Sequence, residues 1–427
     1  VDGDYFTTGD NTPALGTSSI IRMAVLGGVD GASRILADTL VDPVFAAAYA
    51  GNTQVLDDPS VLPPPGWTLI NRLNPYNDGA LYITLSVGNA YLNPATDTLY
   101  LWDTTNLSAM RIYHYGAGAS TIDIITDNAP GDLMGDDQSL RSLQAYGNVT
   151  IGDVDIAGDV LAMWVNQVED EAEWNIHGQI INLYVNSALS GLEMNAGEVN
   201  AVTVVGDYDD GTNPDPAFLN ADAMGYVKVY GTIAADLTTD RGDLLGVFAY
   251  GNALSAGRIT GDITSQGPML QLYAADNITG TVRVLNGDMG KVTAARMEGA
   301  MIDVDGATTG VVVTLGDFGT ILTPNTSYRS GRGIGYFYVS RGDLQGLVST
   351  GGDLNKLYVR GAMKGRVRAF GDIYAAQFGS MSDAILSAGG DLWKLTVAGS
   401  LSNGWVMAGF DPGDAGLGAG TEDREVT

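Results

Sequence analysis

The chain has 427 residues, no cysteine, 58 glycines and a formal net charge of −29, because 50 acidic residues face only 21 basic ones. This excess of negative charge argues against nucleic acid and anionic lipid as partners, since both need a dense basic footprint, and the lack of cysteine excludes disulfides and Cys-ligated metal sites. No uninterrupted run of about 18 apolar residues occurs, so the sequence predicts no membrane span.

Residues 1–138 predict a separate β-rich region. Segments such as "ALYITLSVGNAYL" and "MRIYHYGAGASTIDII" are rich in β-branched and aromatic residues and are separated by Asn, Pro, Gly and Asp. No fixed repeat interval runs through this part of the chain. We therefore expect strands here, in an arrangement that the sequence leaves open.

A regular interval begins at Ser139. Gly158, Gly178 and Gly197 follow it in steps of 19, 20 and 19 residues, each before an aliphatic strand-like segment. Short strands at a constant offset, with no helical period between them, predict stacked parallel coils. The fold class expected for residues 139–409 is therefore all-β, a parallel β-solenoid (β-helix) with coils of about 19 residues, and residues 410–427 are expected to be a flexible tail.

Two acidic loops interrupt the coils. "VEDEAEW" gathers Glu169, Asp170, Glu171 and Glu173, and paired carboxylates of this kind occur in glycosidases. The second loop, "GDYDDGTNPDP", lies in an acidic insertion predicted near 206–224. Calcium takes several hard oxygen ligands from one flexible loop, so the second loop is a candidate calcium site, the alternative being a solvated acidic turn. Its candidate ligands are Asp207, Asp209, Asp210, Asn213 and Asp215.

The repeat is clearest at Gly352, Gly371 and Gly390, which are 19 residues apart and each precede Asp and a large apolar residue. The Gly-Asp pair is interpreted as a corner, with glycine providing positive φ and aspartate bonding to its own backbone. In the following half-unit, Met363, Gly365, Val367 and Ala369 alternate with three basic residues. A period of two predicts a strand with one face buried, so Lys364, Arg366 and Arg368 are expected to share an outer face.

Repeats such as "GGDLNKLYVRG" and "GGDLWKLTVAG" resemble the long Gly-Asp-rich repeat proteins of Planctomycetes-type bacteria and related surface-layer or adhesin-like solenoids. The resemblance extends over about residues 139–409. It implies export to the cell surface and a structural role, and it implies no active-site residues.

The function expected from the sequence is an extracellular, non-enzymatic building block that self-assembles into a surface layer, sheath or filament. Charge is uneven along the chain, since residues 131–227 hold 17 acidic residues and one basic residue. We therefore expect the basic strip of Lys364, Arg366 and Arg368 to dock on an acidic surface of a neighbouring copy. The alternative is a β-helix that binds or cleaves polysaccharide, and cell-surface polysaccharide is a candidate partner in either case.

Overall fold

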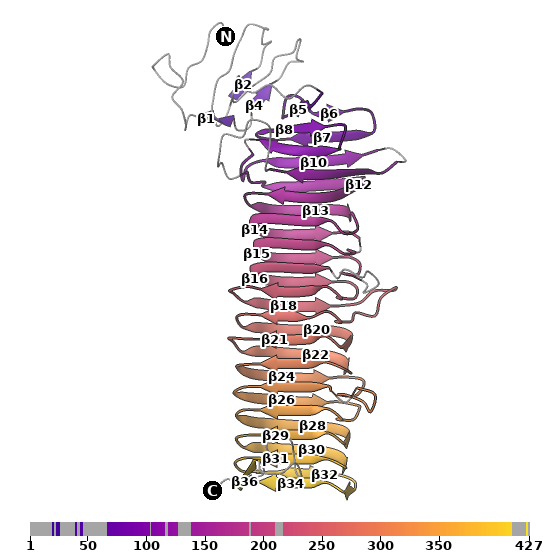
Figure 1. The fold of residues 1–427 in the computed structure, drawn as a ribbon, viewed down its shortest axis with the longest axis vertical. Helices are drawn as coiled ribbons and strands as arrows, with labels where there is room; N and C mark the ends of the chain where they lie inside the picture. Colours follow the sequence, from indigo (N-terminus) through magenta and orange to yellow (C-terminus); the bar gives the residue numbers. More distant parts are fainter. Residues whose placement is uncertain are drawn as a thin grey trace. The chain divides into compact units, whose positions relative to one another are not determined.

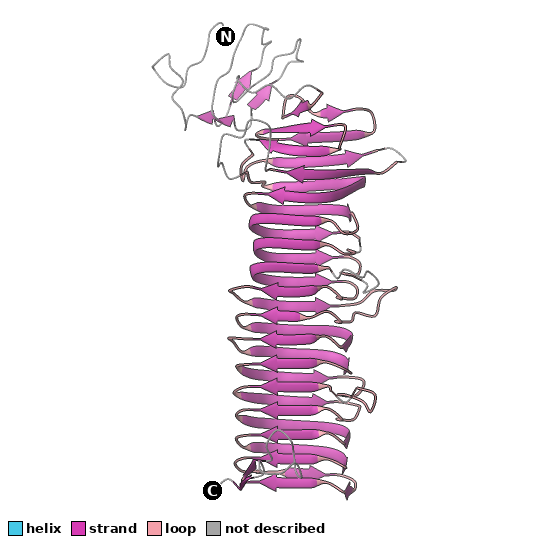
Figure 2. Ribbon diagram, viewed as in Figure 1, coloured by secondary structure: helices cyan, strands magenta, loops and turns pink. Residues whose placement is uncertain are grey.

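The computed structural model describes residues 19–20, 23–25, 39–40, 43–45, 66–102, 104–115, 118–126, 138–187, 189–209, 217–323, 325–411 and 424–425. These residues form strands, turns and bends, and none of them is helical (Figure 2). The chain divides into two compact units, residues 1–181 and 182–427. The predicted all-β class is confirmed.

The first unit contains two small parallel strand pairs and a larger sheet. The small pairs are β1 (Ser19–Ile20) with β3 (Thr39–Leu40), and β2 (Met23–Val25) with β4 (Pro43–Phe45). The larger sheet consists of β5 (Thr68–Ile70), β6 (Tyr76–Asn77), β7 (Leu81–Leu85), β8 (Asn89–Asn93), β9 (Thr98–Trp102), β10 (Ala109–His114), β11 (Ser120–Ile125), β12 (Ser142–Ile156), β13 (Val160–Val168) and the start of β14 (Glu173–Val185).

Strand direction changes within this sheet. Pairing is antiparallel between β5 and β8, β8 and β9, β6 and β7, and β7 and β10. It is parallel between β9 and β11, and β12 pairs in parallel with β10, β11, β13 and β14. The predicted β-rich N-terminal region is therefore present, and parallel pairing already includes β10, upstream of the boundary predicted at residue 138.

The second unit is a stack of parallel coils (Figure 1). One side, the long-strand face, is made by the C-terminal halves of β15 (Glu193–Val204) and β16 (Phe218–Val229) and by β18 (Leu244–Ala249), β20 (Met269–Ile278), β22 (Met289–Met297), β24 (Ala307–Val313), β26 (Gly333–Val339), β28 (Asp353–Met363), β30 (Ile373–Ser382) and β32 (Leu395–Val397).

A second side, the short-strand face, is made mostly of strands of three or four residues. It comprises β17 (Asp236–Thr239), β19 (Ile263–Ser265), β21 (Thr281–Val284), β23 (Met301–Val304), β25 (Ser327–Ser330), β27 (Leu347–Thr350), β29 (Arg366–Ala369), β31 (Ile385–Ala388) and β34 (Trp405–Ala408). Short strands β33 (Leu401–Ser402), β35 (Phe410–Asp411) and β36 (Arg424–Glu425) complete the unit, and β35 and β36 pair antiparallel.

Between the two faces runs a middle column in which single residues of successive coils form parallel bridges. Its members include Ile233, Ile259, Phe318, Leu344 and Met363. These side chains are fully buried, and the inward residues of both faces are buried in every coil but the last. Each coil thus contributes to three ladders that enclose one apolar core, which is the arrangement of a parallel β-solenoid.

The coils without inserted loops have the predicted length of about 19 residues. Hydrogen bonds between equivalent corners join residues 19 apart in the last coils, as from Asp372 to Asp353, and 20 apart in others, as from Gln179 to Asp159. Three coils are longer, with separations of 25 residues at Asp207 and Thr232 and 26 residues at two later corners. Inserted loops therefore leave the ladders intact. β16 begins at Phe218, inside the range predicted for the acidic insertion.

The aspartates of the Gly-Asp motif connect neighbouring coils. Asp353 Oδ1 accepts a hydrogen bond from the backbone N–H of Asp372 at 2.9 Å, and Asp372 Oδ1 accepts one from Asp391 N–H at 2.8 Å. The same bond occurs at the other corners of the coil. We call all of these residues the corner aspartates. Besides Asp353 and Asp372, they are Asp159, Asp207, Asp236, Asp262, Asp288, Asp317 and Asp343.

This geometry corrects the interpretation of the motif. Gly352, Gly371 and Gly390 do not have positive φ. A Cβ on Gly371 would instead collide with Asp353 Oδ1, and one on Gly390 with Asp372 Oδ1. At Gly371 and Gly390, glycine is required because the carboxylate of the preceding coil fills the space of a side chain, whereas at Gly352 the backbone carbonyl of Arg332 fills it. Aspartate is required because it bonds to the next coil rather than to itself.

The predicted alternation of buried and exposed residues is confirmed around β29. Met363, Val367 and Ala369 are buried, whereas Lys364 and Arg366 are exposed. The burial expected of an inward residue is incomplete at Val397. This residue pairs with buried Phe378 as the register requires, but it is only half-buried because no described strand pairs with β32 on its other side.

Candidate functional surface

Two of the predicted calcium ligands, Asp207 and Asp209, lie at the corner after Val204. Asp207 Oδ1 accepts a hydrogen bond from Thr232 N–H at 2.6 Å, so this residue is a corner aspartate. Asp209 is 1% exposed, has φ of 58°, and its Oδ2 accepts a bond from Ala217 N–H at 3.1 Å. Both carboxylates thus bind the backbone. Asp210, Asn213 and Asp215 lie outside the described residues, and calcium at this loop stays a prediction.

The three predicted interface residues lie close in sequence but differ in their partners. Lys364 Nζ forms an ion pair with Asp343 Oδ2 at 2.6 Å, and this hydrogen bond and charge raise the pKa of the lysine. Arg368 Nε donates to Ser349 Oγ at 3.0 Å, and its guanidinium lies 5.2 Å from the centre of the Phe370 ring. Arg366 projects from β29 into solvent. Two of the three are therefore already engaged inside the chain.

The carboxylates proposed for a glycosidase lie on an open turn. Glu169, Asp170, Glu171 and Glu173 are all exposed. Within the described ranges, no group of three or more His, Asp or Glu side chains is arranged to hold a metal ion. This turn therefore provides no enclosed pair of carboxylates that could flank the glycosidic bond of a substrate.

The long-strand face carries a surface that sequence reasoning did not identify, the aromatic–lysine strip. It consists of two adjacent outward rows that run from coil to coil, together with Lys394. The first row is Tyr226, Gly246, Gln271, Lys291, Gly310, Tyr336, Lys356 and Ala375, and the second is Lys228, Phe248, Tyr273, Thr293, Val312, Tyr338, Tyr358, Gln377 and Thr396.

The charge of this strip is opposite to that of the chain. It contains no Asp or Glu, although the chain has 50 acidic residues. It carries four of the five lysines in the sequence, namely Lys228, Lys291, Lys356 and Lys394. None of these four ammonium groups forms an ion pair with a residue that the structure describes, and Lys228 Nζ lies 5.8 Å from the centre of the Tyr226 ring.

Aromatic rings cluster at two places along the strip. In the first cluster, the rings of Phe248 and Tyr250 are stacked with centroids 5.7 Å apart and planes at 12°. Tyr230 and Tyr273 lie 5.4 and 5.6 Å from Tyr250. Gly246 makes this packing possible, because a Cβ there would be 2.8 Å from Phe248 Cε2. The rings therefore lie against the sheet as a platform.

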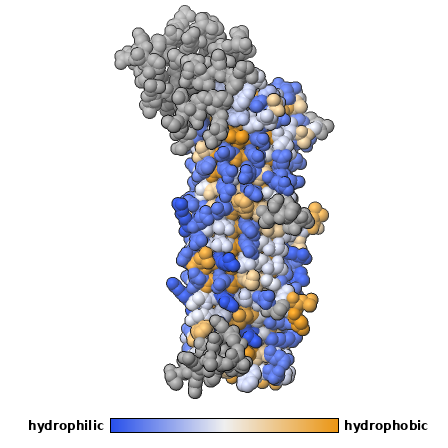
Figure 3. All heavy atoms as spheres, viewed as in Figure 1, coloured by the Kyte–Doolittle hydropathy of each residue, from blue (hydrophilic) through white to orange (hydrophobic). Residues whose placement is uncertain are grey.

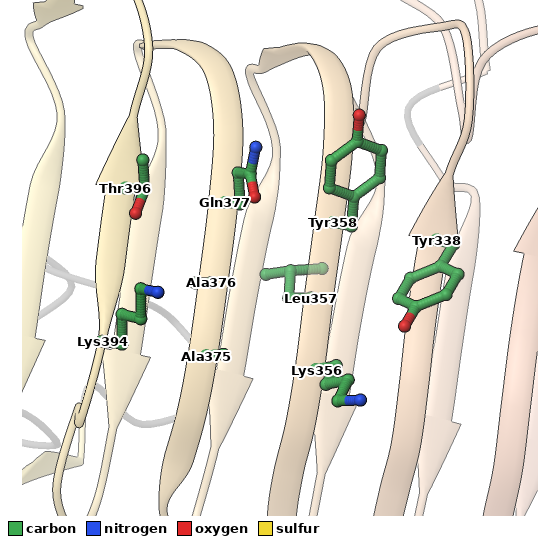
Figure 4. Close-up of a pocket in the computed structure, with 9 residues that line it drawn as sticks. All are labelled: Tyr338, Lys356, Leu357, Tyr358, Ala375, Ala376, Gln377, Lys394 and Thr396. Carbon is green, nitrogen blue, oxygen red and sulfur yellow. The ribbon is translucent and has the colours of Figure 1, made fainter.

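The second cluster borders a shallow hollow (Figure 4). Tyr336 and Tyr338 have centroids 5.1 Å apart, and the Tyr336 ring covers the space of a side chain at Gly310. Tyr338 and Tyr358 meet edge to face at 6.1 Å. Lys356 and Lys394 line the same hollow. Two aromatic rings and two ammonium groups are thus presented together.

A signal for this strip exists in the sequence, in "GYFYV" at 335–339 and "KLYV" at 356–359, where tyrosines or lysines alternate with apolar residues. The signal becomes a surface only when the register is known. Figure 3 shows the outside of the coils from one side, where hydrophilic side chains predominate and hydrophobic ones form separate patches.

The comparisons with known proteins add no further constraint. No protein-family model matches the chain, and no curated protein or solved structure is significantly similar to it. Over the described residues, no helix is long and apolar enough to cross a membrane.

Proposed function

We propose that the chain is an extracellular structural protein whose copies assemble into a surface layer, sheath or filament. The observation that supports this proposal is the continuity of the coil stack in residues 182–411. Every strand of the long-strand face from β15 to β32 is hydrogen-bonded to the next. Corner aspartates add bonds between side chain and backbone. Such a stack is suited to a passive, rigid role.

Assembly would use complementary charge. Arg366 is exposed and makes no ion pair with any described residue, in contrast to Lys364. The acidic residues that dominate the chain offer a partner surface on a second copy. A contact between two different surfaces of identical chains propagates instead of closing, so it builds a filament or a sheet.

The test compares Arg366→Glu with Arg332→Glu, a matched charge reversal at another exposed arginine. Light scattering and electron microscopy of the full chain would follow assembly at low and high salt. We expect Arg366→Glu to prevent assembly, Arg332→Glu to leave it intact, and added salt to weaken it by screening. The thermal stability of both variants should stay within about 0.5 kcal/mol of the wild type. A wild-type chain that stays monomeric at all concentrations would contradict the proposal.

The alternative function, polysaccharide cleavage, finds no enclosed carboxylate pair on the 169–173 turn. Polysaccharide binding is favoured by a different observation, the aromatic–lysine strip.

A further inference from the structure

We propose that the aromatic–lysine strip of the long-strand face is a binding site for an extended anionic polysaccharide that carries carboxylate groups. This site is separate from the contact proposed for assembly, which lies on the short-strand face. The two proposals therefore stand or fall on different measurements.

The lysines indicate the charge of the ligand. Four ammonium groups without a carboxylate partner among the described residues lie on a strip that has no acidic residue. In a chain of net charge −29, surface lysines have many potential carboxylate partners, yet none of these four forms an ion pair with a residue that the structure describes. The long-range repulsion of the chain is screened beyond about 8 Å at physiological salt, so the local groups determine what binds in contact.

The aromatic rings indicate the kind of polymer. Sugar rings have an apolar face of C–H groups and a rim of hydroxyls. A tyrosine matches both, because it offers a large apolar ring and a polar hydroxyl. Tyr226, Tyr230 and Tyr250 are 38%, 43% and 39% exposed, so part of each ring is free for contact.

The direction of the strip fits an extended chain. Successive coils of a parallel ladder rise by about 4.8 Å. Both aromatic clusters include members of the same two rows, and Tyr230 and Tyr250 of the first cluster lie two residues beyond Lys228 and Phe248 of the second row. A polymer that follows these rows would pass the Tyr226–Tyr273 platform and then the hollow between Tyr338 and Lys394. At the hollow, one sugar would rest against the ring of Tyr358 with its carboxylate near Lys356, and a sugar further along the polymer would bring a second carboxylate near Lys394, two coils away.

The spacing of charge distinguishes this ligand from nucleic acid. Lys228, Lys291 and Lys356 are several coils apart, as their ladder positions require. Nucleic acid carries a charge at every nucleotide, and proteins that bind it match that density with many Lys and Arg. A strip with few, separated lysines and many tyrosines fits a polymer in which sugar faces contribute as much as charge.

The test uses calorimetric titration of the full chain with an oligogalacturonate of about six sugars, a cello-oligosaccharide of the same length and a single-stranded oligothymidylate. The two glycans separate the contribution of charge from that of stacking. We expect the wild type to bind the oligogalacturonate, to bind the neutral glycan at least about tenfold more weakly, and to bind the oligothymidylate more weakly than the oligogalacturonate.

Two sets of variants place the site. Lys356→Gln with Lys394→Gln should weaken oligogalacturonate binding by about tenfold or more, whereas Lys364→Gln, a lysine outside the strip, should leave it unchanged. Tyr358→Ala should weaken both glycans, and Tyr358→Phe should restore binding because the ring is kept. Thermal unfolding of each variant establishes that it is folded.

The proposal is overturned if the wild type binds no oligogalacturonate at millimolar concentration, or if the double lysine variant binds as well as Lys364→Gln. Stronger binding of oligothymidylate would assign the strip to nucleic acid instead. If Tyr358→Ala abolishes self-association while glycans never bind, the strip is a contact between copies. Loss of assembly in Arg366→Glu with intact glycan binding would leave the present proposal standing.

Discussion

The two faces of residues 182–411 have similar interiors and different exteriors. Except in the last coil, inward residues on both faces are buried and mostly apolar, such as Leu357 on β28 and Val367 on β29. Outward residues on the short-strand face mix signs, since Arg283, Asp303 and Arg329 are ladder neighbours. The two outward rows of the aromatic–lysine strip, on the long-strand face, hold no acidic residue. The inward rows thus stabilise the fold. The outward rows can differ in chemistry without changing the core, so they carry the candidate binding surfaces.

The largest effect should come from charge placed inside either face. Val367→Asp and Leu357→Asp should each cost several kcal/mol of unfolding free energy, because the carboxylate would be buried without a partner. Arg366→Asp, at a neighbouring outward position, should be tolerated. Val397→Asp should cost less than Val367→Asp, since Val397 is only half-buried. Chemical denaturation of the four variants measures this, and equal losses for Val367→Asp and Arg366→Asp would show that the inward assignment is wrong.

The next largest effect concerns the corners that join the faces. Gly371→Ala should lower stability by about 1–3 kcal/mol, because the added methyl group would overlap with Asp353 Oδ1. Gly333→Ala is the matched control, since the nearest atom to its Cβ, the carbonyl oxygen of Asp353, would be 3.3 Å away. Denaturation curves that show the same loss for both would refute the role assigned to the corner aspartates.

A smaller effect should appear in acid at the corner between the long-strand face and the middle column. Asp276 accepts hydrogen bonds from Arg258 Nε at 2.9 Å and from Arg296 Nε at 3.1 Å. Burial raises the pKa of Asp276, but the hydrogen bonds and charges of Arg296 and Arg258 outweigh it, and the net pKa lies below the usual value.

A carboxylate whose pKa is lower in the folded state adds stability above its unfolded pKa, and this stability is lost as the pH falls through the folded value. The stability difference between the wild type and Asp276→Asn should therefore be largest near neutral pH and disappear in acid. Denaturation at a series of pH values measures it. A difference that grows as the pH falls would contradict the ion-pair assignment.

The smallest effect is expected at the loop after Tyr208, between the middle column and the short-strand face. If calcium binds there, calorimetric titration with calcium, up to millimolar concentration, of protein pretreated with a chelator should give a heat of binding. Bound calcium should also raise the melting temperature slightly. Asp215→Asn should reduce both effects. Since Asp207 and Asp209 already bind the backbone, replacing either would also disturb the fold, which makes Asp215 the cleaner probe. No heat and no shift in the melting temperature would remove calcium from the account.

Much of the fold was predictable from local patterns. The interval of 19 residues and the alternation around Val367 and Arg366 define the coil and its inner side, because a strand places successive side chains on opposite faces. The reason for the glycines was not predictable from one coil, since Gly371 is constrained by Asp353 in the preceding coil.

The candidate site was harder to predict for the same reason. The aromatic–lysine strip is assembled from residues about 20 or more positions apart, and inserted loops shift their spacing, so neither row is visible as a sequence motif. The pairing of Lys364 with Asp343 was missed because it joins different coils. Local alternation identifies which residues point outward, whereas the ladder register decides what they meet.

The register itself can be measured with disulfides, because the chain has no cysteine of its own. Tyr358 and Gln377 are ladder neighbours on the long-strand face, and neighbouring parallel strands lie about 4.8 Å apart, within reach of a disulfide. Tyr358 and Thr396 are two coils apart, at about 9.6 Å, which is too far. Mass spectrometry after mild oxidation should therefore find a disulfide in Tyr358→Cys with Gln377→Cys, and none within single chains of Tyr358→Cys with Thr396→Cys. The reverse result, or equal yields, would contradict the stack of 19-residue coils on which the whole account depends.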